Sequence, residues 1–212
     1  MTALRNELLK LALPLVRTHG FTREALSRSV LALPEPHPEP LRDTAVSALF
    51  GEGDDARRTL ISAWLDEGRA HMRASAPGSP AIRDVLRGRL RYNEPVLSLL
   101  PEAFATLALT PGHILDPLPA LKHAVSVADE ACAVVGDKTV GTSWYARRAS
   151  LAAIYTASEL HQIQSPQTAD AFLDGLLAGS SQLKGAADDT AQFASYILSS
   201  WKGILKSRGV FI

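Results

Sequence analysis

Apolar residues recur three and four positions apart along almost the whole chain, and proline, glycine or serine separates one such run from the next. This spacing is that of the buried face of an α-helix, whereas the alternation of polar and apolar residues typical of a half-buried strand is scarce. A chain of 212 residues is long enough to bury one substantial core. We therefore predict an all-α protein.

The N-terminal part of the chain predicts a group of short helices. Gly20 ends a first helix that starts near Leu4, and Thr22 is suited to cap a second one. The alternate prolines of residues 34–40 exclude a helix, so this segment is expected to be a stiff connector. A third short helix is expected at residues 41–50.

Longer helices follow. The first is expected at residues 54–74, and the next begins at Ser79-Pro80 and is broken at Pro95. Two more are expected at residues 117–135 and 143–165. The buried stripe of the 54–74 helix is predicted to comprise Leu60, Ile61, Trp64, Leu65, Gly68 and Met72.

The sequence carries no recognisable catalytic or cofactor motif, and we expect a nonenzymatic protein without a metal or cofactor. It lacks Gly-x-Ser-x-Gly, His-Glu-x-x-His, a phosphate-cradling glycine loop and the dinucleotide fingerprint. Glu67 and His71 are the nearest approach to a metal-binding helix face, but such a pair is more often a solvated one. Cys132 is the only cysteine, which excludes an intramolecular disulfide and a thiolate cluster.

The order and lengths of the first helices resemble the helix-turn-helix part of tetracycline-repressor-type regulators. In a DNA-binding protein of this type the third helix presents basic or amide side chains to the duplex. Here it offers Arg42, while Glu35, Glu39 and Asp43 crowd the same region. The chain has 22 basic and 22 acidic residues, so no basic excess attracts phosphate. We therefore expect no binding of nucleic acid.

A second resemblance is more specific. It rests on Trp144-Tyr145-Ala146-Arg147-Arg148-Ala149-Ser150-Leu151-Ala152-Ala153-Ile154-Tyr155, Ser158-Glu159-Leu160 and Ala171-Phe172-Leu173. These segments resemble the signature of the Coq-nine family of ubiquinone (coenzyme Q) biosynthesis. The similarity covers about residues 5–177, and the closing residues 200–209 look most like fungal members.

The resemblance implies a repressor-like, homodimeric helical fold that has lost DNA binding and holds an isoprenoid lipid or a phospholipid. It also implies docking on the di-iron demethoxyubiquinone hydroxylase, among other proteins of the ubiquinone-biosynthesis complex, on the matrix side of the mitochondrial inner membrane. The corresponding parts are a helix-turn-helix-like part (1–50), a lipid-binding and dimerisation domain (51–180), a flexible spacer (181–187) and a membrane-binding amphipathic helix (188–212).

The aromatic pair Trp144 and Tyr145 falls in the first turn of a helix that Thr142 or Ser143 is expected to cap. With Arg148 one turn further on, the composition is that of an interface hot spot, and we assign these three residues to partner binding. Burial of the aromatic pair in the core is the alternative.

Ten apolar residues are candidates for lining a lipid pocket, and each of them also suits an ordinary core. They are Leu86, Leu90, Val96, Leu97, Leu100, Phe104, Leu107, Leu151, Ile154 and Tyr155.

The terminal segment predicts an interfacial amphipathic helix behind a Gly/Ser/Ala spacer at residues 179–187. Its candidate membrane-binding residues are Phe193, Ile197, Trp201, Lys202, Ile204, Leu205, Lys206 and Arg208. Packing of the same stripe on the domain is the alternative.

These patterns favour a lipid-binding accessory protein that binds isoprenoid quinone intermediates at the membrane and presents them to the hydroxylase. A transcriptional regulator with a lipophilic effector shares the fold and is the first alternative. A scaffold of the biosynthetic complex without a lipid of its own is the second.

Overall fold

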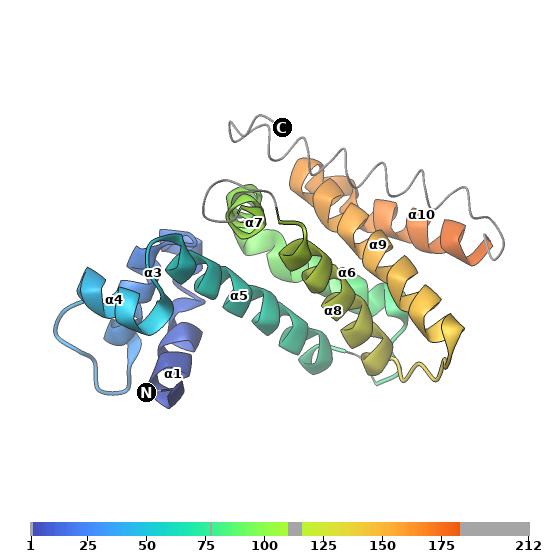
Figure 1. Ribbon diagram of the computed structural model, residues 1–212. Coiled ribbons are helices and arrows are strands. Elements are labelled where there is room, and N and C mark those ends of the chain that lie inside the picture. Colours follow the sequence, from blue (N-terminus) through green and yellow to red (C-terminus); the bar gives the residue numbers. More distant parts are fainter. Residues whose placement is uncertain (1, 77, 110–115, 183–212) are drawn as a thin grey trace. The chain divides into compact units, whose positions relative to one another are not determined.

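A computed structural model describes residues 2–76, 78–109 and 116–182, and every element in these ranges is helical (Figure 1). The all-α prediction is therefore confirmed for the described residues. The α-helices are α1 (Thr2–Ala12), α2 (Val16–His19), α3 (Arg23–Arg28), α4 (Asp43–Phe50), α5 (Asp54–Ala74), α6 (Ile82–Asn93), α7 (Leu100–Ala108), α8 (Leu118–Val134), α9 (Thr142–Gln164) and α10 (Ala169–Gln182). The 3-10 helices are η1 (Ser29–Ala32), η2 (Glu94–Leu99) and η3 (Pro166–Thr168).

The chain divides into two compact units, and each is described separately. Unit 1 comprises Met1–Glu67 and Ser98–Leu115, and unit 2 comprises Gly68–Leu97 and Asp116–Ile212.

The N-terminal helix of unit 1 is interrupted where a continuous helix was predicted. It splits into α1 and α2 at a turn over residues 13–15, because Pro14 has no N–H to donate, and the N–H of Leu15 donates instead to the Ala12 carbonyl at 3.0 Å. Gly20 ends α2 with a φ of 69°, as predicted.

Thr22 caps α3, as predicted, and its Oγ1 accepts a hydrogen bond from the backbone N–H of Ala25 at 3.4 Å. The neighbouring Phe21 is buried against Trp64 with an edge-to-face ring distance of 6.0 Å. The cap and this aromatic contact together hold α3 against α5.

Residues 34–40 are not helical, which confirms the predicted connector. The third helix starts at Asp43 rather than at Leu41, because the backbone of Leu41 is bonded to α3 instead. The N–H of Leu41 donates to the Ser27 carbonyl at 3.0 Å, and the Ser27 hydroxyl donates to the Leu41 carbonyl at 2.7 Å. On α4 the carboxylate of Asp43 pairs with Arg23 of α3 at 2.7 Å.

The helix α5 has the predicted bounds, and its predicted stripe is buried. The part of the stripe from Gly68 onward belongs to unit 2, and Gly68 lies against Arg89 and Tyr92 of α6.

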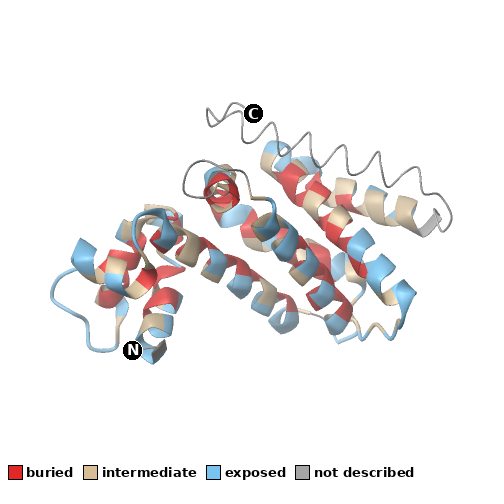
Figure 2. Cartoon of the chain, in the orientation of Figure 1, coloured by how far each residue is buried: buried red, intermediate tan, exposed pale blue. Residues whose placement is uncertain are grey.

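In unit 2, α9 packs between α8 and α10, and α6 contacts all three (Figure 1). Figure 2 shows that the sides of these helices that face one another are buried. Pro95 breaks the helical run as predicted, with Val96 at φ −126° and ψ 15°. The start of α6 differs from the prediction, because its N-cap is Ala81 and no side chain caps it.

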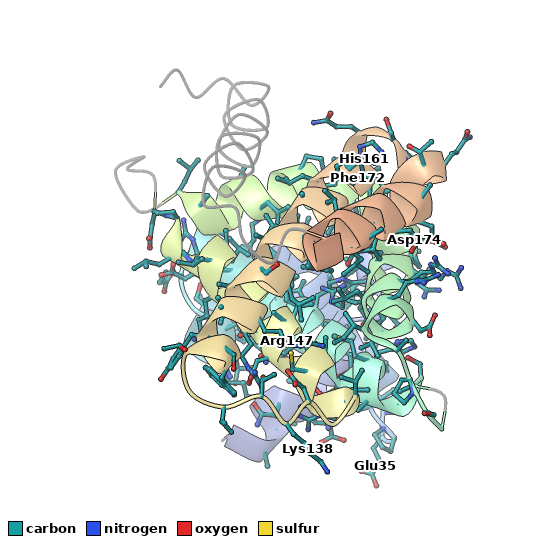
Figure 3. The ribbon with its side chains drawn as sticks, turned by 90° about the vertical axis from the view of Figure 1, so that its right-hand side faces the viewer. Glu35, Lys138, Arg147, His161, Phe172 and Asp174 are labelled. Atoms are coloured by element: carbon teal, nitrogen blue, oxygen red, sulfur yellow. The ribbon has the colours of Figure 1, made fainter. Side chains whose placement is uncertain are left out.

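A ladder of ion pairs joins α6 to α10 on the surface of unit 2. Arg87 contacts the carboxylates of Asp170 at 3.3 Å and of Asp174 at 2.8 Å, and Arg91 contacts Asp170 at 3.1 Å. Asp174 is labelled in Figure 3.

The helix α10 runs through Gly179 to Gln182, so the described part of the chain is still helical where the spacer was expected.

No helix in the described part of the chain is both long enough and apolar enough to cross a membrane.

We expect Thr22→Ala to lower the free energy of unfolding by about 1 kcal/mol, because the first turn of α3 loses the hydroxyl that accepts its N–H group. Chemical denaturation monitored by circular dichroism measures the change. Thr18→Ala is the matched control, since its exposed hydroxyl only donates to the Leu15 carbonyl within the preceding turn. Equal losses in the two variants would contradict the assigned cap.

Candidate functional site

The core of unit 2 contains a cluster of buried polar side chains centred on Glu159. Its Oε1 accepts hydrogen bonds from the Tyr155 hydroxyl at 2.6 Å and from Asn93 Nδ2 at 2.8 Å. Nε2 of His123 lies 3.3 Å from Oε2. Glu159 is 4% exposed, and Tyr155 and Asn93 are fully buried. Side chains of α6, α8 and α9 therefore meet at one carboxylate.

Arg89 extends this cluster toward α5. Its Nη1 donates to Asn93 Oδ1 at 2.7 Å, so Asn93 bridges the guanidinium and the carboxylate of Glu159. The Arg89 Cζ lies 5.6 Å from the ring centroid of Tyr92 and 6.0 Å from that of Tyr155. The guanidinium is thus buried between aromatic rings and is linked to the cluster by Asn93.

The surroundings of Glu159 keep it ionised. Burial raises the pKa of this carboxyl, but the charge and hydrogen bond of His123, the charge of Arg89 and the hydroxyl of Tyr155 lower it to about 2. The pKa of Tyr155 lies well above its ordinary value, chiefly because burial disfavours the phenolate and secondarily because Glu159 is negative. Tyr155 is therefore a permanent hydrogen-bond donor to Glu159.

No sequence motif marks this cluster. Arg89 was on the apolar face of its predicted helix, between Leu86 and Leu90, and Glu159 follows Tyr155 by one turn. A charged residue on an apolar face was the available signal, because such a residue is rarely buried without a partner.

The second group lies at the start of α9, where the first turns are largely exposed (Figure 2). The rings of Trp144 and Tyr145 meet edge to face at 4.8 Å, and Tyr145 is 70% exposed. The guanidinium of Arg148 lies 3.9 Å from the ring centroid of Trp144. Its Nε donates to Asp129 of α8 at 2.7 Å, and Arg148 is itself buried. The buried guanidinium of Arg148 therefore packs on the Trp144 ring, and Tyr145 is the exposed residue of the aromatic pair.

The loop between α8 and α9 folds around the carboxylate of Asp137. This group accepts hydrogen bonds from the backbone N–H and the hydroxyl of Thr139. It also pairs with Nε of Arg147 at 3.0 Å, and Arg147 is labelled in Figure 3 with the neighbouring Lys138. Burial raises the pKa of Asp137, but these hydrogen bonds and the charge of Arg147 bring it below its ordinary value. The loop that precedes Trp144 is therefore organised around a negative charge.

The expected cap of α9 is not made. Gly141 is the N-cap at φ 65°, and neither Thr142 nor Ser143 caps the helix with its side chain. The Ser143 hydroxyl instead donates backwards to the Val140 carbonyl at 2.7 Å.

The ten apolar candidates for the lipid pocket divide between the two units. One group is buried in a single core of unit 2, in which it packs with residues of α5, α8 and α10: Leu86, Leu90, Leu151, Ile154 and Tyr155. In unit 2 Val96 is buried and Leu97 half-buried, whereas Leu100 and Phe104 are buried and Leu107 is half-buried in unit 1.

In the described ranges, no three histidine, cysteine, aspartate or glutamate side chains gather in a way that could hold a metal ion. The candidate membrane-binding residues Phe193, Ile197, Trp201, Lys202, Ile204, Leu205, Lys206 and Arg208 lie outside the described residues.

In the described residues both units are helical, and unit 2 has a buried ionic core. A family model described as COQ9 matches residues 118–184, which include the aromatic pair and Glu159. The predicted resemblance to the Coq-nine family is thereby confirmed.

Curated relatives carry the same family name. The proteins from Bos taurus and Homo sapiens, named "Ubiquinone biosynthesis protein COQ9, mitochondrial", are each 29% identical over 186 residues, which are 80% of this chain and 54% of each relative. The relative from Schizosaccharomyces pombe is 26% identical over 146 residues, 67% of this chain and 57% of that protein. The chain thus spans about half the length of the curated relatives it matches.

The low pKa of Glu159 predicts a pH-dependent stability. Because the pKa of the folded state, about 2, lies below the ordinary 4.5, the stabilisation by ionised Glu159 is complete above pH 4.5. It is lost as the pH falls toward 2, by on the order of 3 kcal/mol. We expect Glu159→Gln to be strongly destabilised at pH 7, and its deficit relative to the wild type to shrink between pH 4.5 and 2.

Urea denaturation across this pH range measures the deficit. Glu24→Gln removes an exposed carboxylate paired with Arg28 and is the control, with a small deficit at every pH. A deficit of Glu159→Gln that is independent of pH would show that the carboxylate is not ionised in the core.

Proposed function

We propose that this chain acts in ubiquinone biosynthesis as a nonenzymatic accessory protein that binds an isoprenoid quinone intermediate and presents it to the di-iron demethoxyubiquinone hydroxylase. The names of the COQ9 relatives support the pathway and a mitochondrial location. The family match over residues 118–184 supports the transfer of these properties to this part of the chain. Lipid binding, homodimerisation and a position on the matrix face of the inner membrane belong to the same proposal.

The observation that carries the docking part is the aromatic pair of α9, in which Tyr145 is exposed and Trp144 is half-buried. Tyr145 places a large ring in solvent, and Trp144 is held in position by the cation of Arg148. An aromatic side chain that is rigid before binding loses little conformational entropy in a complex, and such residues dominate protein interfaces. We therefore assign the start of α9 to the hydroxylase.

Residues 188–212, outside the described part of the chain, are proposed to attach the protein to the membrane surface. Their sequence has apolar residues at helical spacing and, from Thr190 onward, no acidic side chain. Association of this kind brings the protein to the lipid without spanning the bilayer.

We expect Tyr145→Ala and Trp144→Ala each to weaken binding to the purified hydroxylase by about 1–3 kcal/mol with little change in thermal stability. Arg148→Ala is expected to weaken binding as well and to lower stability, because it removes a buried side chain that packs on Trp144 and pairs with Asp129. Biolayer interferometry gives the dissociation constants. Leu121→Ala is the control, since it removes an exposed apolar side chain from the N-terminal half of α8.

Wild-type affinity in a folded Tyr145→Ala and a folded Trp144→Ala variant would exclude this surface as the docking site. A sequence-dependent mobility shift of duplex DNA at physiological salt would instead favour the transcriptional regulator.

Organic extraction of the purified chain followed by mass spectrometry tests lipid binding. We expect an isoprenoid quinone or its precursor to co-purify, because the helical core offers an apolar environment for such a lipid. An unrelated helical protein purified in parallel is the control. Recovery of no lipid above that control would favour a scaffold in the biosynthetic complex.

A further inference from the structure

Two nitrogens of Arg89, Nε and Nη2, have no hydrogen-bond partner among the described residues, although the side chain is fully buried. The third nitrogen, Nη1, donates to Asn93. Buried donors without an acceptor are rare in native proteins, because they have lost their hydrogen bonds to water. The environment of Arg89 is therefore incomplete.

The two open donors share one edge of the guanidinium. Nε–H and the adjacent N–H of Nη2 point in nearly the same direction in the plane of the group, and this fork matches two acceptor oxygens at once. The edge can only donate, because a guanidinium has no acceptor. Its complement is a pair of neighbouring oxygens rather than a hydroxyl donor or an apolar group.

Gly68 of α5 leaves room for the guanidinium of Arg89, because glycine has no side chain. A Cβ at this position would lie 2.9 Å from Arg89 Cζ and 3.0 Å from Nε, so a side chain here would displace the open edge. The rings of Tyr92 and Tyr155 flank the guanidinium at 5.6 and 6.0 Å. Aromatic rings near the guanidinium suit a planar ring more than a hydrated ion.

The charge balance favours a neutral occupant. The ionised carboxylate of Glu159 already lies in the cluster and is connected to Arg89 through Asn93. The cation thus needs acceptor oxygens rather than another negative charge. A quinone ring with a methoxy or hydroxyl group beside a carbonyl carries two neighbouring oxygens without a net charge, whereas a phosphate would add a negative charge.

We propose that the Nε and Nη2 edge of Arg89 binds two neighbouring ring oxygens, a carbonyl and the adjacent methoxy or hydroxyl oxygen, of an isoprenoid quinone. This inference rests on the lipid-binding function proposed above and names its polar anchor. Arg89 then selects the oxygenated ring, and the apolar residues of unit 2 surround it.

The test uses the full chain and a decyl-tailed dimethoxybenzoquinone as the probe, with dissociation constants from fluorescence quenching. We expect Arg89→Met and Arg89→Lys to bind the probe at least about tenfold more weakly than the wild type, roughly 1.4 kcal/mol. Arg89→Lys keeps the charge but lacks the fork, and Gly68→Ala moves the edge without removing it, so both are expected to weaken binding. Arg91→Met, which removes an arginine side chain that is 61% exposed on the same helix, is the control with unchanged affinity.

Circular dichroism and thermal melts without the probe establish which variants fold, and Arg89→Lys decides the outcome if Arg89→Met does not fold. Wild-type affinity in a folded Arg89→Lys variant would overturn the proposal. So would a wild-type chain that does not bind the quinone, or that binds only a short-chain phospholipid. If isoprenoid lipid is extracted equally from the wild type and Arg89→Lys, the proposed function stands and the anchor is wrong; if it is extracted from neither, the lipid-binding function itself fails.

Discussion

The helical core of unit 2 depends on a single ionised carboxylate that groups from three helices surround. Glu159 of α9 receives the amide of Asn93 from α6, the imidazole of His123 from α8 and the hydroxyl of Tyr155 from its own helix. A buried charge of this kind is tolerated only when its partners are in place, so the carboxylate demands a particular arrangement of all three helices. Apolar packing alone tolerates more variation in how helices meet.

The two functional groups of unit 2 share α9 but differ in their exposure. Near the start of the helix, Arg148 is buried and Tyr145 is exposed, so a hidden cation supports a surface that is available to a partner. Further along, the polar side chain of Glu159 faces inward. One helix therefore carries both the candidate docking surface and the carboxylate of the buried cluster, about four turns apart.

Much of the fold was predictable because its signals are local. The prolines of residues 34–40, the cap at Thr22 and the bounds and stripe of α5 each depend on neighbours within one helix or turn. The break at Pro14 was equally local and was missed, because the apolar spacing on both sides continues across it.

The candidate site was only partly predictable. The sequence pointed to Trp144 and Tyr145, but nothing in it distinguishes the supporting role of Arg148 from an exposed contact. The partners Asn93 and Glu159 are 66 positions apart, and helical periodicity does not show which distant residue completes a polar group. Pairing across helices is a tertiary property, so it emerged only from the structure.

The ladder between α6 and α10 has a consequence for how the helices are aligned. Arg87 and Arg91 are four residues apart, as are Asp170 and Asp174, so the two rows of charges have the same repeat. Sliding α10 by one turn, about 5.4 Å, would still set arginine opposite aspartate. The charges thus hold the helices together while selecting the register only weakly, and that choice falls to Leu173, which is fully buried in the core of unit 2 and would leave its place there with any such slip.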